Sequence, residues 1–130
     1  MKVLFDTNIL IFAAEGRITD DVRQFFDNED CEKYFSAASI WEMVIKSMIH
    51  RLTLGVPIEA LEERMVLTGI KKLNIETRHI YGVQRLKDVN NDPFDRLLVS
   101  QALEEGLEFI TSDKRLEEYA GCVRFFPKRQ

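Results

Sequence analysis

The sequence predicts an α/β sandwich domain built around a parallel sheet. Short apolar runs without polar alternation occur near both ends of the chain, and such runs are typical of strands covered on both faces. Segments with helical spacing of apolar residues separate these runs, and alternation of strands and helices favours parallel pairing. With 130 residues and no linker or internal repeat, residues 1–130 are expected to form a single domain.

The N-terminal elements follow from this apolar patterning. Lys2–Asp6 is predicted to be a short buried strand. The segment Thr7–Glu15 is predicted to be a helix, and Gly16 ends it. A second helix is expected in Thr19–Phe26, where polar residues cap its start. Tyr34-Phe35 is then expected to be a short strand.

Ser36 is a suitable cap for a helix that runs to about His50. This helix places apolar residues on one face, which is expected to pack into the core: Ala37, Trp41, Val44, Ile45, Met48 and Leu52. After an interruption by glycine and proline, Ile58–Leu67 is predicted to be an amphipathic helix. Lys72–Ile75 is predicted to be a strand, and Glu76–Lys87 a further helix.

The last third of the chain has the clearest signals. Asp92-Pro93 predicts a helix start, with Asp at the cap and Pro in the first turn, and this helix runs to Gly106. Leu107–Thr111 is predicted to be a buried strand. A helix over Asp113–Tyr119 and a final strand over Val123–Phe126 complete the alternation.

The net charge, the cysteine spacing and the length of the apolar stretches limit the classes of protein to which this chain could belong. The formal net charge is −4, whereas a general nucleic-acid coat protein would be basic. A nuclease remains compatible, because a cation bound at an acidic site restores positive potential locally. Cys31 and Cys122 match no metal or redox spacing, so we expect reduced thiols. No stretch approaches the roughly 18 apolar residues of a membrane span, so a cytoplasmic protein with no membrane partner is expected.

Four acidic residues occupy positions where an apolar core should resist a charge. Asp6 and Asp113 come at the ends of predicted strands. Glu42 lies among large apolar residues of one predicted helix, and Asp95 lies in the first turn of another. Carboxylates without a His or Cys cluster favour a hard divalent cation held by oxygen. Because ligand sites form beyond the carboxyl ends of parallel strands, Asp6 and Asp113 are expected at the same edge.

Each of these acids also has a purely structural interpretation. Asp6 and Asp113 could cap the helices that follow them. Glu42 could pair with Lys46 one helical turn further on, in a contact worth about 0.3–0.5 kcal/mol. Asp95 could be a first-turn charge stabilised by the helix dipole. Taken one at a time, these interpretations are favoured over a functional site.

The acids and their neighbours together resemble a known family. Asp6-Thr7-Asn8, the helical Glu42, Asp92-Pro93-Phe94-Asp95-Arg96 and Thr111-Ser112-Asp113 resemble PIN-domain nucleases in order and spacing. The resemblance is closest to the small toxins of VapC-type toxin–antitoxin pairs. In one departure, Val89-Asn90-Asn91 stands where relatives often carry a histidine, and this difference is expected to affect loop order or substrate contact.

The resemblance implies a three-layer α/β/α PIN-like fold with a central parallel sheet. It also implies a metal-dependent endoribonuclease toxin that hydrolyses RNA phosphodiester bonds with Mg²⁺ or Mn²⁺. The catalytic and metal-binding residues would be Asp6, Glu42, Asp95 and Asp113, with Asp6 and Asp95 as direct ligands. Family analogy adds an RNA substrate, a cognate antitoxin protein and a homodimer.

Other polar residues near the acids are secondary candidates. Hydrogen bonds that hold the carboxylates are expected from Thr7, Asn8, Thr111 and Ser112, with local turn and cap bonding as the alternative. Weaker candidates for substrate contacts are Arg96, Lys46 and Lys114. The alternative for Arg96 is an ion pair with an acid of its own helix, and the alternative for the two lysines is a solvated surface charge.

Three rival interpretations are weaker. A receiver-type phosphoacceptor domain would carry a paired acid after its first strand, whereas Thr7-Asn8 follows Asp6 here. A haloacid-dehalogenase-type phosphatase would need a second Asp where Asn8 stands. A catalytically silent PIN-like module that binds RNA or a partner would be favoured by the loss of an acid, and all four are present.

Overall fold

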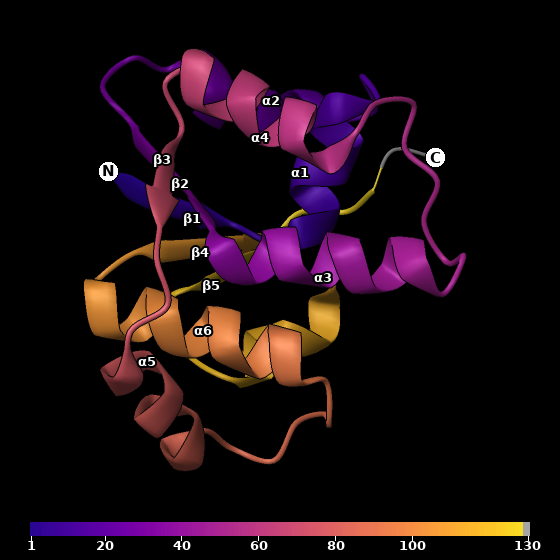
Figure 1. Cartoon of the computed structure of the whole chain (residues 1–130). Helices are drawn as coiled ribbons and strands as arrows, with labels where there is room; N and C mark the ends of the chain where they lie inside the picture. Colours follow the sequence, from indigo (N-terminus) through magenta and orange to yellow (C-terminus); the bar gives the residue numbers. More distant parts are fainter. Residues whose placement is uncertain (129–130) are drawn as a thin grey trace.

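The computed structural model describes residues 1–128, and a parallel sheet lies at its centre (Figure 1). The strands are β1 (Lys2–Phe5), β2 (Glu32–Ser36), β3 (Lys71–Leu73), β4 (Glu108–Thr111) and β5 (Val123–Phe125). They lie in the order β3-β2-β1-β4-β5, and each neighbouring pair is parallel. The predicted parallel α/β fold is therefore confirmed.

Helices connect successive strands, as parallel pairing requires. They are α1 (Thr7–Ala14), α2 (Asp20–Asp27), α3 (Ala37–Met48), α4 (Ile58–Leu67), α5 (Thr77–Gly82) and α6 (Pro93–Glu105), with 3-10 helices η1 (Val83–Arg85) and η2 (Lys114–Glu118). The helix predicted over residues 76–87 is shorter than expected, because α5 gives way to η1 after Gly82. The segment predicted as a helix after β4 is a single 3-10 element. No helix within residues 1–128 is long and apolar enough to cross a membrane.

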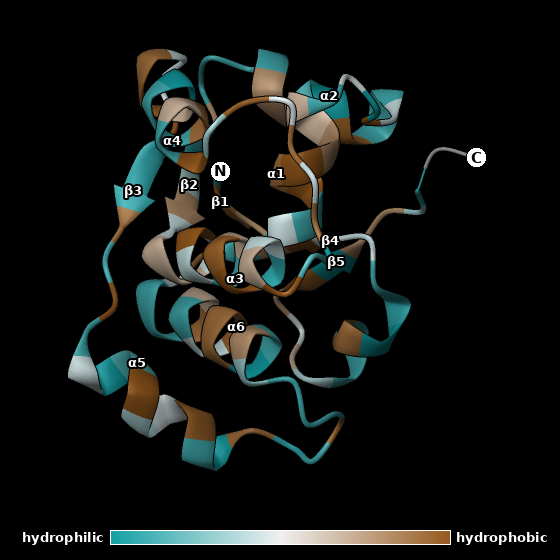
Figure 2. Ribbon diagram, turned by 45° about the vertical axis from the view of Figure 1, so that its right-hand side comes forward, coloured by the Kyte–Doolittle hydropathy of each residue, from teal (hydrophilic) through white to brown (hydrophobic). Residues whose placement is uncertain are grey.

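The sheet is covered on both faces, which produces three layers. Val3 and Phe5 of β1 belong to a core cluster that includes buried residues of α1, α2 and α4. Leu4, which points to the opposite face, belongs to a second cluster built largely from α6 and the β4–β5 region. Figure 2 shows the hydrophobic segments of α1 and α6 on either side of the sheet. The α/β/α layering is thus confirmed.

The orientation of α3 differs from the prediction. The face expected to pack into the core is largely outside, since Trp41 is 53% exposed and Met48 is 70% exposed. The buried residues of α3 are Ala38, Ser39, Glu42 and Met43. Hydrophobic spacing identified an apolar face, but α3 contacts both α1 and α6 and turns its smaller, partly polar face toward them. Glu42 is therefore directed inward.

The strand order creates a switch point between β1 and β4. From β1 the chain moves outward through β2 to β3, and it later returns to β4 and β5 on the other side of β1. The N–H of Asp6 donates to the carbonyl oxygen of Ile110 over 2.9 Å, so the ends of β1 and β4 are adjacent. Ligands of open α/β sheets bind outside the carboxyl ends of strands at such a point.

Candidate active site

Asp6 is a buried carboxylate at the carboxyl end of β1, with 4% of its surface exposed. Its Oδ1 accepts a hydrogen bond from the N–H of Thr7 at 2.7 Å, which caps α1. Its Oδ2 accepts from the hydroxyl of Thr111 on β4 at 2.7 Å. Burial raises the pKa of Asp6 to about 6, although the bonds from Thr111 and Thr7 favour the ionised form. Asp6 therefore caps α1, and burial makes the ionised form of its carboxyl group unfavourable.

Glu42 is held in place from two sides. Its Oε1 accepts from the hydroxyl of Thr7 at 2.6 Å, and its Oε2 pairs with Nζ of Lys46 at 2.7 Å. The hydroxyls of Thr7 and Ser39 lie 2.8 Å apart, so Ser39 extends this network. Because the Thr7 proton is given to Glu42, Ser39 acts as the donor to Thr7. Ser39 was not identified from the sequence, since a lone serine in a helix carries no distinguishing signal.

Asp95 lies in the first turn of α6, beside the cap that Asp92 makes with the N–H groups of Phe94 and Asp95. Burial, followed by the charges of Asp6 and Asp92, raises the pKa of Asp95 to about 7. The side-chain amide of Asn90 donates to its Oδ2 at 3.1 Å. The hydroxyl of Tyr119 in turn hydrogen bonds the side-chain oxygen of Asn90. The loop that departs from the family pattern therefore positions Asp95.

Asp113 caps η2 and is paired with a neighbouring arginine. Nε of Arg115 lies 3.1 Å from its Oδ1, and Nη2 lies 2.7 Å from its Oδ2, which is a two-pronged ion pair. The hydrogen bonds and charge of Arg115 lower the pKa of Asp113. Thr111 links this acid to Asp6, because its Oγ1 accepts from the N–H of Asp113 and donates to Asp6.

The four acids form one electrostatic network at the switch point. The charges of Glu42 and Asp113 contribute to the raised pKa of Asp6, and the charges of Asp6 and Glu42 contribute to that of Asp95. They are not tightly clustered, since no three of them place oxygen atoms within 4.8 Å of one another in the described part of the chain. Carboxylate oxygens are the ligands that a hard divalent cation prefers, and such a cation can keep some of its water.

The hydrogen-bonding candidates divide into two groups. Thr7 and Thr111 each donate to a carboxylate, Thr7 to Glu42 and Thr111 to Asp6. Asn8 is exposed and makes no side-chain hydrogen bond within residues 1–128. Ser112 is buried, but its hydroxyl reaches none of the four carboxylates among the described residues. Asn8 and Ser112 therefore do not support the acids in this structure.

The three basic candidates occupy different environments. Arg96 donates to the carbonyl oxygens of Lys87, Asn90 and Val83, so its guanidinium braces the loop before α6. This geometry argues against the expected phosphate contact by Arg96, because these carbonyl groups already engage it. Lys46 is paired with Glu42. Lys114 is exposed and has no ion pair within residues 1–128, which leaves it available to a ligand.

A second group of potential metal ligands lies between α5 and α6. Atoms of Glu76, His79 and Glu105 lie within 4.8 Å of one another. His79 is fully buried, and its Nδ1 accepts from the N–H of Glu76 at 2.9 Å, so the ring proton belongs on Nε2. Nε2 is 2.8 Å from Glu105, which also pairs with Arg78. Because both ring nitrogens are engaged, this group fastens α5 to α6 rather than binding a metal.

Replacing His79 by alanine is expected to lower the free energy of unfolding by about 2–4 kcal/mol. The substitution removes a buried ring and leaves the N–H of Glu76 without its acceptor. Urea denaturation measures the loss, and exposed His50→Asn serves as the control with an effect within about 0.5 kcal/mol. Affinity for Mn²⁺ should be unchanged, and a drop in that affinity would mean that the group does bind metal.

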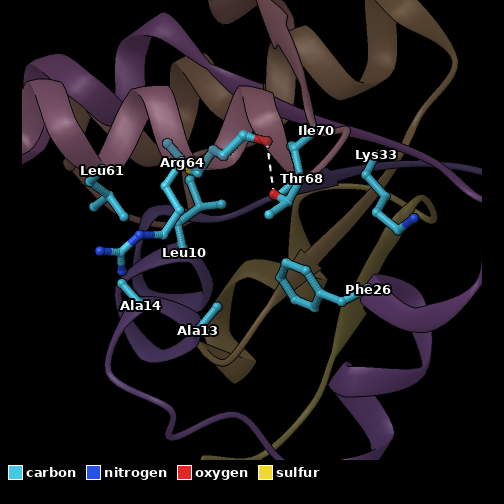
Figure 3. A pocket seen from close by; sticks show the side chains of 10 residues that line it. Leu10, Ala13, Ala14, Phe26, Lys33, Leu61, Arg64, Thr68 and Ile70 are labelled. Atoms are coloured by element: carbon cyan, nitrogen blue, oxygen red, sulfur yellow. Dashed lines mark hydrogen bonds between the residues drawn. The ribbon is translucent and has the colours of Figure 1, made fainter.

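The cavity drawn in Figure 3 lies away from the acids, between α1, α2 and α4. It has a volume of about 270 Å³ and is lined by Leu10, Ala13, Ala14, Phe26, Lys33, Leu61, Arg64, Met65, Thr68 and Ile70. The side chains of Arg64 and Lys33 lie on opposite sides of it (Figure 3). None of the four acids lines this cavity, so the acidic site is separate from it.

A three-layer parallel α/β domain with a carboxylate network at its switch point defines a recognisable class of protein. The family model described as PIN domain matches residues 3–121. The chain therefore belongs to the PIN domain family. No curated protein sequence matches it significantly.

Solved structures share the fold over nearly the whole chain. A toxin–antitoxin complex from Klebsiella pneumoniae aligns with a TM-score of 0.66 and 22% identity, covering 96% of this chain and 98% of the other. VapBC2 from Rickettsia felis, bound to a DNA fragment from its promoter, aligns with a TM-score of 0.70, 12% identity and coverage of 98% and 99%. FitAcB from Neisseria gonorrhoeae aligns with a TM-score of 0.61, 19% identity and 98% coverage of each chain.

Proposed function

We propose that this PIN-domain protein is a metal-dependent endoribonuclease toxin of the VapC type. The observation that carries the proposal is the buried carboxylate of Asp6, whose pKa is raised to about 6 and which interacts with the charges of Glu42 and Asp113. A carboxylate in this environment is unfavourable without a cation. The toxin–antitoxin complexes among the structural neighbours support the biological class.

The donor set fits Mg²⁺ or Mn²⁺, with Asp6 and Asp95 as the direct ligands. When bound, such a cation stabilises charge on a phosphodiester and lowers the pKa of its water. Asp6 is aimed by Thr7 and Thr111, and Asp95 is aimed by Asn90. These hydrogen bonds fix where the carboxylate oxygens lie and keep both side chains from turning away.

The remaining acids flank this pair. Glu42 is held by Thr7 and Lys46, and Asp113 by Arg115. We propose that they contact water molecules around the cation rather than the cation itself. Lys114, exposed at the start of η2, is the basic side chain best placed to approach the backbone of an RNA strand.

The proposal is tested by incubating the purified protein with total bacterial RNA and Mn²⁺ or Mg²⁺, and mapping new RNA ends by sequencing. Discrete new ends that disappear with a chelator are the expected result, and they would also name the substrate. If folded protein without antitoxin gives no new ends, the silent RNA- or partner-binding module becomes the better interpretation. Retained RNA binding would then be measured by filter binding.

We further propose that a cognate antitoxin suppresses the cleavage and that the protein acts in the cytoplasm. The three solved neighbours named above include toxin–antitoxin complexes, which supports an antitoxin partner. Co-expression with a candidate antitoxin should give a stable complex that no longer cleaves RNA. A candidate that binds without suppressing cleavage would not be the inhibitor proposed here.

We also propose a homodimer that uses the apolar outer face of α3. Exposed residues on this face include Trp41, Met48 and, just past the helix, Ile49. Met48→Glu places a charge in such an interface and is expected to convert the dimer to a monomer, because an unpaired buried charge is unfavourable. Size-exclusion chromatography with light scattering measures the mass, and exposed Leu67→Glu on α4 is the control. A wild-type monomer at high concentration would rule the dimer out.

A further inference from the structure

The four acids of the proposed site differ in how their charges are compensated. Glu42 and Asp113 each have a basic partner from the same chain, and these partners are Lys46 and Arg115. Among residues 1–128, Asp6 accepts only from the neutral donors Thr7 and Thr111. Asp95 likewise accepts from the neutral amide of Asn90. Within the described part of the chain, the site therefore has two acids with a basic partner and two without one.

The pairing of Glu42 with Lys46 is built into α3. The two residues are one helical turn apart, so the ion pair needs no rearrangement elsewhere. The Glu42 carboxylate is 5% exposed and the Lys46 side chain 36% exposed, which makes the contact less screened than an ordinary surface pair. Both oxygens of Glu42 are engaged, one by Lys46 and the other by Thr7. Neither carboxylate oxygen of Glu42 is therefore left without a hydrogen-bond or ion-pair partner.

The pairing of Asp113 with Arg115 is equally local. The guanidinium meets both carboxylate oxygens, and the N–H of Arg115 also donates to Oδ1. The geometry is that of a two-pronged arginine–carboxylate pair, which holds orientation as well as charge. The Arg115 side chain is 69% exposed, so it contacts Asp113 from the solvent side.

We propose that Lys46 and Arg115 are positioning residues that supply permanent counter-charges to Glu42 and Asp113, so that the site binds one divalent cation at Asp6 and Asp95. This inference rests on the proposed metal-dependent function and adds its stoichiometry. The two unpaired carboxylates carry two negative charges, which one divalent cation neutralises.

The test measures Mn²⁺ binding to the RNA-free full chain by isothermal titration calorimetry and electron paramagnetic resonance. Wild-type protein is expected to bind one ion. Lys46→Met and Arg115→Gln should each bind that ion about tenfold more tightly, because a nearby positive charge is lost. The double variant should bind a second, weaker ion at the freed carboxylates. Two ions in the wild type, or an unchanged double variant, would overturn the inference.

Matched controls separate the local effect from a general change in charge. Lys72→Met removes a lysine paired with Glu62, and Arg78→Gln removes an arginine paired with Glu76 and Glu105. Both lie outside the acidic site and should leave Mn²⁺ binding unchanged. If they strengthen binding as much as the site variants do, the compensation is not specific.

A conservative variant and RNA kinetics complete the test. Lys46→Arg retains the charge and should restore the wild-type stoichiometry and affinity, whereas a merely structural lysine would not be rescued in this way. Lys46→Met should lower kcat more than it raises KM, because Glu42 loses its orientation and not its access to RNA. If the wild type shows no Mn²⁺ binding that depends on Asp6, as tested with Asp6→Asn, the result counts against the proposed function itself. One bound ion with unaffected charge variants would count against this inference alone.

Discussion

Asp6→Asn and Asp95→Asn are each expected to lower kcat/KM for RNA cleavage by about 10³-fold or more, with the fold intact. A metal-bound carboxylate underlies charge stabilisation worth several kcal/mol, and asparagine keeps the shape while removing the charge. Asp6 is the buried acid at the switch point, and its charge contributes to the raised pKa of Asp95. Cleavage of a defined RNA and Mn²⁺ calorimetry should show activity and metal binding lost together.

The same Asp6→Asn substitution is expected to stabilise the metal-free protein at neutral pH. Burial holds the pKa of Asp6 at about 6, so at pH 7.5 the folded protein contains a carboxylate whose ionised form is penalised. Asparagine removes this penalty, and its oxygen can still accept from the N–H of Thr7. The expected gain is about 2 kcal/mol in the free energy of unfolding, measured with urea in EDTA.

Asp30→Asn is the control for both effects. Asp30 is an exposed aspartate just before β2, at the opposite edge of the sheet from Asp6. The substitution Asp30→Asn should leave RNA cleavage and Mn²⁺ affinity unchanged. It should change the free energy of unfolding by no more than about 0.5 kcal/mol. If Asp6→Asn retained full cleavage, or if it destabilised the metal-free protein strongly, the assignment of Asp6 as a charged metal ligand would be wrong.

The stability of the metal-free protein is expected to fall as the pH rises from about 4 to about 7.5. Folding raises the pKa of Asp6 from its ordinary 3.8 to about 6, and that of Asp95 to about 7. In this window the folded protein binds more protons than the unfolded chain, so increasing pH favours unfolding. The loss begins above the ordinary pKa and is complete above the folded values.

The magnitude and the effect of metal can both be measured. Asp6 contributes up to about 3 kcal/mol, whereas the contribution of Asp95 is smaller than its pKa suggests because it is partly exposed to solvent. Urea denaturation in EDTA between pH 4.5 and 8 gives the profile. Mg²⁺ or Mn²⁺ should restore stability at pH 8 and have little effect at pH 5, where protons compete for the same oxygens.

Two outcomes would contradict this account. A flat profile in EDTA would show that the two carboxylates are not destabilised by folding. An equal metal effect at pH 5 and pH 8 would show that the ions bind elsewhere. The double variant Asp6→Asn, Asp95→Asn is the matched control, and its stability should depend on pH much less between 5 and 7.5.

Features that depend on short-range signals were predicted from sequence. The start of α6 follows from Asp92-Pro93, because a capping side chain and a fixed φ act within one turn. The bounds of α4 were predicted as Ile58–Leu67, as observed. The parallel sheet follows from short apolar strands separated by helices. The four acids were identified because charges stood in or beside apolar segments.

The particular partners in long-range contacts were not predicted. Thr111 was expected to hold a carboxylate, but its pairing with Asp6, 105 positions away in the sequence, exists because β1 and β4 are neighbours. The role of Asn90 in holding Asp95 depends on Tyr119, which comes from the β4–β5 connection. The attachment of His79 to Glu105 depends on the packing of α5 against α6. No local pattern shows which distant residue each of these side chains will contact.

The sequence by itself determined the alternation of strands and helices, the caps of α3 and α6 and the identity of the acidic residues, since these depend on interactions within a few residues. Only the tertiary structure decided which face of α3 is buried, that Arg96 braces a loop, and which carboxylates Thr111 and Asn90 hold. The physical reason is that burial and contacts between distant residues are properties of the space around a side chain. That space is formed by strand order and helix packing, which bring together residues far apart in the chain.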